Sequence, residues 1–133
     1  MDTDFAFICD YAEQDTKLHA VGIGFDTIFA TALPAIHPVV TFVARLRGSV
    51  AERGLKSLSL RLIDAEGQDV SPPVEGQMQF DVKPGQLAAA ANVVIAMQGI
   101  QFTKWGEHAF HLLVQDREMA RVPFSVSEPP TTS

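Results

Sequence analysis

Two aspartates near the start of the chain are the residues best placed for chemistry. Asp10 and Asp26 each end or interrupt an apolar run that alternates like a strand. Carboxylates at such positions commonly accept backbone N–H groups and cap loops, and we favour that role here. With Tyr11 and His37 they could instead line a small site, so these four residues are our weak ligand-binding candidates.

The histidines and the single cysteine do not form a recognisable metal site. His108 and His111 are three residues apart, a spacing that brings ligands together on a helix but separates them on a strand. His19 and Cys9 could face each other across a hairpin, yet zinc needs three or four converging ligands. We therefore expect no metal and no cofactor, and a buried thiol for Cys9 beside the phenylalanines of its strand.

One pair of glycines invites a nucleotide-binding interpretation. Gly22 and Gly24 begin the spacing of the dinucleotide fingerprint, but Thr27 stands where the third glycine is required. The fingerprint also needs a helix that directs its N-terminus at the phosphates, and no helix pattern follows. A bulge in a strand is the better explanation of this glycine pair.

Acidic residues around a turn are the remaining candidates for a site. Asp64, Glu66 and Asp69 lack the spaced oxygens and the distal glutamate of an EF-hand. A polar hairpin turn is the default, and a weak calcium site is the alternative that stays open. The sequence has no Gly-x-Ser-x-Gly element either, so we predict no catalytic residues and no enzyme.

The whole chain has the composition of one ordinary globular domain. It has 133 residues, of which 47% are hydrophobic and 20% are charged, and its net charge is −6. An acidic chain is a poor match for nucleic acid, because binding to phosphates requires a basic surface. The single cysteine, the acidic start and the lack of an apolar run of about 20 residues predict a cytoplasmic protein that does not enter a membrane.

Period-two alternation of apolar and polar residues is the dominant structural signal. It predicts about eight short strands and no long helix. The first two strands should form a hairpin, and Pro123 should place the last strand at or near a sheet edge. The expected strands cover residues 5–11, 17–28, 39–47, 57–64, 74–82, 92–98, 107–115 and 118–126.

Three segments interrupt this pattern. Pro34 and Pro38 predict a break in regular pairing. Residues 87–91 are ambiguous, because four alanines favour a helix whereas the valines and isoleucine that follow favour a strand. Residues 127–133 are rich in Ser, Thr and Pro, so we expect a disordered tail after a single β-sandwich domain at residues 1–126.

Short stretches spread over most of the chain carry a family resemblance. They are the opening run 5–12 with its Cys-Asp-Tyr-Ala, the glycine-containing run 22–26, the Leu33-Pro34-Ala35 break, and the closing runs 106–110 and 121–126. They resemble an uncharacterised bacterial family of unknown function. The resemblance implies an immunoglobulin-like sandwich with an added N-terminal hairpin, and it implies no activity. His108 stands where a corner tyrosine is expected, and its ring nitrogen could bond a neighbouring backbone group as the hydroxyl does.

We therefore expect an all-β, immunoglobulin-like sandwich that acts as a non-enzymatic protein-interaction or assembly module. The alternative is a small-molecule-binding domain with its pocket at the N-terminal hairpin. Two strands are apolar on both faces, which predicts an outer patch covered by residues 28–33 or by a second copy. We favour a homodimer. The candidate interface residues are Val39, Val43, Val94 and Ala96.

Overall fold

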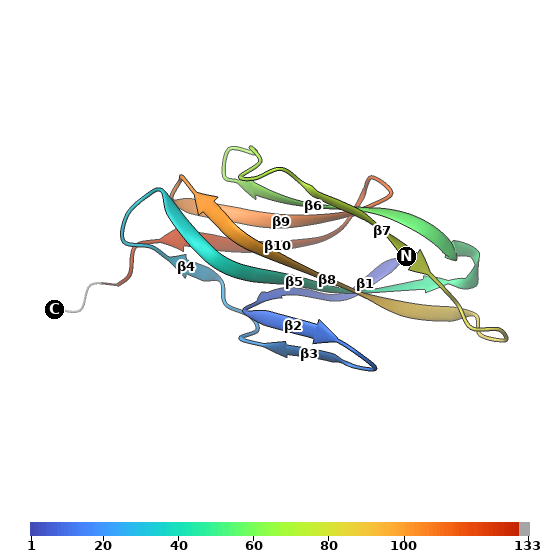
Figure 1. Cartoon of the computed structure of the whole chain (residues 1–133). Coiled ribbons are helices and arrows are strands. Elements are labelled where there is room, and N and C mark those ends of the chain that lie inside the picture. The colour runs from blue at the N-terminus through green and yellow to red at the C-terminus, as the bar shows by residue number, and fades with distance from the viewer. Residues whose placement is uncertain (131–133) are drawn as a thin grey trace.

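The computed structural model describes residues 1–130 and consists almost entirely of β-strands (Figure 1). Within these residues the one helical turn is the 3₁₀ helix η1 (Val50–Glu52). The expectation of an all-β chain is confirmed, with ten strands rather than about eight. The strands are β1 (Asp2–Cys9), β2 (Tyr11–Gln14), β3 (Leu18–Val21), β4 (Thr27–Phe29), β5 (Ala35–Ser49), β6 (Gly54–Asp64), β7 (Val74–Phe80), β8 (Ala88–Phe102), β9 (Gly106–Val114) and β10 (Arg117–Ser127).

Two larger sheets and one hairpin contain these strands. β5 is the centre of a three-stranded sheet with the order β1-β5-β8. The second sheet has five strands in the order β4-β10-β9-β6-β7. Neighbours in both sheets are antiparallel, except that β4 runs parallel to β10. β2 and β3 pair only with each other, as a separate antiparallel hairpin.

The two larger sheets face each other across one apolar core. Inward-pointing residues alternate along each strand, as period-two patterning requires. Phe42 of β5 meets Phe110 of β9 across the core, with ring centroids 6.1 Å apart. Phe124 stacks on Phe110 at 5.5 Å and meets Phe102 edge-on at 5.9 Å. Each such buried side chain stabilises the fold by roughly 1.5–3 kcal/mol relative to exposure.

The N-terminal hairpin is shorter than the sequence predicts, and its strands have different partners. Residues 5–9 belong to β1, which pairs with β5 rather than with the following run. The hairpin consists of β2 and β3, in which Tyr11 lies opposite Val21. The predicted second strand is divided, because Gly22 and Gly24 follow β3 with φ angles of 73° and 84°. The chain then enters β4, which joins the opposite sheet.

β5 and β8 are both longer than predicted. β5 begins at Ala35 and continues through Pro38, so the predicted break in pairing at this proline is wrong. Pro38 has no N–H to donate, and it lies where Gly99 of β8 takes a φ of 64°. Residues 88–91 are extended and pair with the last residues of β5. Pairing with β5 therefore outweighs the helix preference of the alanines.

β10 is the last strand and has a full-length partner on only one side. Pro123 pairs with β9, and β4 joins the other side of β10 only from Ser125 onward. Pro123 thus occupies an edge position, as expected of a proline within a strand. β10 extends to Ser127, one residue beyond the predicted end of the domain. Residues 128–130 follow without regular structure, and residues 131–133 of the predicted tail lie outside the described residues.

Candidate functional site

Asp10 and Tyr11 lie together at the junction between β1 and the hairpin. The Asp10 N–H donates to the Val21 carbonyl at 3.0 Å. Its carboxylate packs over Gly22, where an added Cβ would lie 2.1 Å from a carboxylate oxygen. The exposed Tyr11 hydroxyl donates to the Glu13 carboxylate at 2.9 Å, and this contact raises the pKa of Tyr11. Asp10 is therefore part of the packing that orients the hairpin.

Asp26 and His37 lie on other elements. The Asp26 carbonyl accepts the N–H of Ser125 at 2.8 Å, and its carboxylate accepts the Thr27 hydroxyl at 3.2 Å. The backbone bond joins the start of β4 to β10, and the carboxylate bonds a hydroxyl rather than the backbone N–H groups expected of a loop cap. His37 is half-buried within β5. Five surface hollows are lined by residues other than the four candidates. A ligand-binding role for these four therefore stays a prediction.

The two histidines of β9 have local partners. Nδ1 of His108 donates to the Gly106 carbonyl at 2.8 Å, and its ring stacks on Phe124 with centroids 5.6 Å apart. This is a backbone bond of the kind expected from the corner position. His111 pairs with Glu118 across β9 and β10. Within residues 1–130, no three His, Cys, Asp or Glu side chains are grouped closely enough to hold a metal ion.

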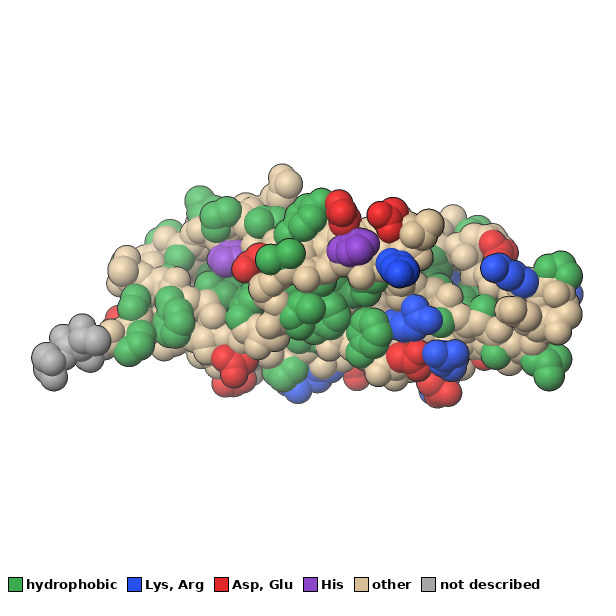
Figure 2. Space-filling model, turned by 90° about the horizontal axis from the view of Figure 1, so that it is seen from below, with side chains coloured by type: hydrophobic (Ala, Val, Ile, Leu, Met, Phe, Trp, Pro, Cys, Tyr) green, Lys and Arg blue, Asp and Glu red, His purple; other side chains and the backbone are tan. Residues whose placement is uncertain are grey.

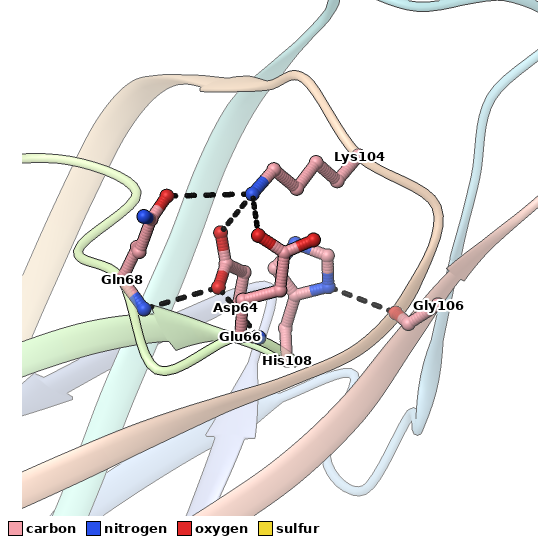
Figure 3. Close-up of polar contacts among 6 residues, drawn as sticks. All are labelled: Asp64, Glu66, Gln68, Lys104, Gly106 and His108. Atoms are coloured by element: carbon pink, nitrogen blue, oxygen red, sulfur yellow. Dashed lines mark hydrogen bonds and ion pairs between the residues drawn. The ribbon is translucent and has the colours of Figure 1, made fainter.

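The turn after β6 holds a polar cluster built around Asp64 (Figure 3). The Asp64 carboxylate accepts the backbone N–H groups of Glu66 and Gln68, at 2.9 and 3.1 Å. Lys104, from the loop between β8 and β9, lies 3.2 Å from Asp64 and 2.8 Å from Glu66. The Gln68 N–H first, and then the Glu66 N–H and Lys104, hold the pKa of Asp64 below its usual value. The acidic turn thus ties two loops together.

The four interface candidates lie on one face of the three-stranded sheet. Val43 pairs directly with Val94. Ala96 lies two residues along β8 and Val39 four residues along β5, on the same face. This pairing confirms that β5 and β8 are neighbours in one sheet. Val43 is fully buried, Val39 and Val94 are half-buried, and Ala96 is exposed. Their role as an interface stays a prediction.

The β2–β3 hairpin covers the middle of this face (Figure 1). β2 lies close to both β5 and β8, and the half-buried pair Ala12 and Ala20 is on one side of the hairpin. Thr41 and Cys9, on the covered sheet, are only 2% and 0% exposed. The expected cover by residues 28–33 is wrong, because β4 within that segment pairs with β10 of the opposite sheet.

Charged side chains at one end of this face neutralise one another. Arg47 donates two hydrogen bonds to Asp4 of β1, at 3.2 and 2.8 Å, and Arg45 lies 3.4 Å from the same carboxylate. Figure 2 shows the molecule from below, with hydrophobic side chains gathered in the middle and charged ones around them. The charged cluster therefore lies across β1 and β5 at one end of the face.

β8 has a strand partner on only one side. β5 pairs with it from Ala88 to Phe102, and within the described residues no strand pairs with its other edge. Its 15 residues include no charged residue and no proline. Edge strands are commonly protected by charges, prolines, short length or bulges. β8 has none of these protections before the positive φ of Gly99, so residues 88–98 form an open, uncharged edge.

The open edge of β8 borders an apolar hollow between the two sheets. The hollow has a volume of about 290 Å³ and lies between β8 and β7, the edge strand of the other sheet. A strand added to β8 would direct alternate side chains toward this hollow. Its lining includes the apolar residues Leu58, Val74, Met78, Val93, Val94 and Ile95 and the polar residues Glu75, Gln77 and Asn92.

Each of the other sheet edges has a protection that β8 lacks. β1 carries the Asp4 cluster, and its Thr3 hydroxyl donates to the Met119 carbonyl of β10. β7 has only 7 residues and includes Glu75, and β4 has only 3 residues. Our sequence reasoning missed the β8 edge. The available signal was the absence of any charged residue from residue 84 to residue 103.

The described residues contain no helix long and apolar enough to span a membrane.

Comparisons with known proteins identify a family but no activity. A similar solved structure is the alkylpurine DNA glycosylase AlkC of Pseudomonas fluorescens, bound to DNA containing an abasic site analogue. It is 9% identical, with a TM-score of 0.43 over 76% of this chain and 27% of the glycosylase chain. This likeness is too low to carry an argument.

No curated protein matches the sequence. A family model matches residues 4–127, nearly the whole described chain, and it confirms the expected membership in an uncharacterised family. The chain belongs to DUF6941, a family of unknown function.

Proposed function

We propose that this domain is a non-enzymatic protein-interaction module whose binding element is the free edge of β8. The observation that carries the proposal is a 15-residue strand with one unpaired edge and no charged residue or proline. Unpaired N–H and C=O groups along an edge can hydrogen-bond an extended segment of another chain. The partner is therefore a protein strand.

Apolar side chains on both sides of the edge support the same proposal. Val94 lies half-buried on the outer face, and Val93 and Ile95 line the hollow on the inner side. In strand addition, backbone hydrogen bonds provide affinity and pockets for alternate side chains provide specificity. A partner strand with apolar residues at alternate positions fits this edge best.

A short peptide tests the proposal directly. A capped peptide with the sequence of residues 92–98 would be titrated into isotope-labelled domain, and amide chemical shifts would be followed by NMR. We expect saturable shifts along β8, and no such shifts with a peptide whose central isoleucine is replaced by proline, because proline cannot donate a hydrogen bond. Shifts confined to other strands, or equal shifts with both peptides, would contradict the proposal.

We also propose that the fold is an immunoglobulin-like sandwich. In that fold, the second and fifth strands share one sheet, and the third strand lies with the last two in the other. The pairing of β5 with β8, and the order β10-β9-β6-β7, support this assignment with β1 as the first strand. The β2–β3 hairpin is then an insertion between β1 and β4. Nuclear Overhauser contacts between these strands in solution would test the order.

A further inference from the structure

We infer that the strand added at β8 is the β8 of a second copy, paired antiparallel about a two-fold axis. The two three-stranded sheets would then form one continuous sheet of six strands. This inference rests on the proposed function, because it names the partner of the same edge. An isologous contact of this kind uses the same surface of both copies, which makes it self-complementary.

The charge distribution favours a second copy as the occupant. Each chain carries a net charge of −6, so two copies repel each other least when they meet at an uncharged surface, where no like charges come into contact. Residues 84–103 contain no charged residue, and β8 lies within them. The other edge strands bring Asp4 or Glu75 to the contact, or are only 3 residues long in the case of β4. Pairing β8 with itself brings no charged residue of the strand into the contact.

The side chains on each face of β8 would also meet the same side chains of the second copy. A two-fold axis perpendicular to the sheet leaves the outer face of each copy on the same side of the joined sheet. The Val94 and Ala96 side chains of the two copies would then form one apolar patch beside the hairpins. On the inner side, the hollow lined by Val93 and Ile95 in one copy would adjoin the same hollow in the other.

The backbone sets the extent of the contact. β8 is extended and in continuous register with β5 through residues 88–98. Gly99 interrupts this geometry with a φ of 64°, opposite the proline of β5. The alanines at 88–91 have small side chains that allow a partner backbone to approach. The paired segment should therefore lie within residues 88–98.

Light scattering after size exclusion tests the pairing. We expect the wild type to show twice the mass of one chain at high concentration. Ala96→Glu places like charges at the exposed edge of both copies, and we expect the dimer dissociation constant to rise at least about tenfold. Ala32→Glu makes the same change at an exposed loop position and should leave the dimer intact.

The outcomes separate this inference from the proposed function. If the wild type is monomeric at every concentration yet binds the 92–98 peptide at β8, the inference of a second copy is wrong. The proposed function, strand addition at β8, is then still supported. A monomer that binds no peptide overturns both. If Ala96→Glu loses its β-sheet circular dichroism spectrum, Gln98→Glu replaces it as the edge variant. If the dimer dissociation constant is unchanged in a folded edge variant, the contact lies elsewhere and the inference is overturned.

Discussion

Asp64 shows how a single carboxylate can connect two loops. Only 8% of its side chain is exposed, and it receives two backbone N–H bonds within its own turn. Lys104 then joins this turn to the loop before β9. Hydrogen bonds to an ionised carboxylate favour its charged form, which is why the pKa of Asp64 is lowered from 3.8.

The lowered pKa predicts a specific pH dependence. A carboxyl with a depressed folded-state pKa stabilises the protein above its unfolded pKa, and this contribution is lost as the pH falls below about 4. Asp64→Asn should lower the melting temperature at pH 7 and should flatten its fall between about pH 4 and pH 2. Equal slopes for the wild type and Asp64→Asn would show that Asp64 does not titrate as described.

Gly22 is a second position where one residue decides local geometry. Its φ of 73° costs an L-residue about 1–2 kcal/mol, and a Cβ there would also meet the Asp10 carboxylate. Gly22→Ala should therefore destabilise the domain more than Gly24→Ala, where φ is 84° but no atom lies within 4 Å. Chemical denaturation measures both free energies of unfolding. The difference should shrink in an Asp10→Ala background, which removes the carboxylate atoms but keeps the Cβ at 3.1 Å. An undiminished difference would rule out the proposed contact.

At the scale of elements, the hairpin acts as a cover that can be tested through Cys9. The thiol is 0% exposed, and burial raises its pKa. Its alkylation by iodoacetamide should be roughly a hundredfold slower than that of an exposed thiol, as expected for a local opening free energy of about 3 kcal/mol. The reference is the Cys9→Ala chain carrying Ala32→Cys. Gly22→Ala should speed the reaction at Cys9. Equal rates for wild type and reference would show that the hairpin does not protect this face.

The sequence identifies the inward faces of the strands better than their partners. Alternation placed Val40, Phe42 and Leu46 of β5 on the inner face, and all three are buried. The same alternation could not show that β1 pairs with β5 instead of with the next run, because period two specifies faces and not neighbours. The alanines at 88–91 were ambiguous because their weak helix preference is overridden only by pairing with β5.

The candidate site was harder to predict from the sequence than the fold was. Val94 and Ala96 were identified as apolar and outward, and both border the site now proposed. Pro123 marked β10 as an edge strand, but β8 contains no proline or charged residue that would mark an edge, so its position depends on the order of strands in the sheet. The absence of charge from residue 84 to residue 103 becomes informative only once β8 is known to be an edge.

At the scale of the whole molecule, the two edge strands of the three-stranded sheet differ. β1 takes part in a charged cluster and lies near β10, whereas β8 is long and uncharged. The hairpin covers the middle of the outer face and leaves Ala96 exposed beside that open edge. A contact along β8 would thus extend the sheet in one direction only.

Amide hydrogen exchange at two protein concentrations tests most directly whether β8 is the interaction element. Backbone N–H groups on an unpaired edge exchange rapidly, and pairing with another strand protects them. The expected change is confined to the alternate amides of residues 88–98 that point away from β5. Their exchange should slow at the higher concentration in the wild type and stay fast in Ala96→Glu. Exchange should change little elsewhere. If these amides exchange at the same rate at both concentrations while light scattering reports a dimer, the claim that β8 mediates the association is wrong.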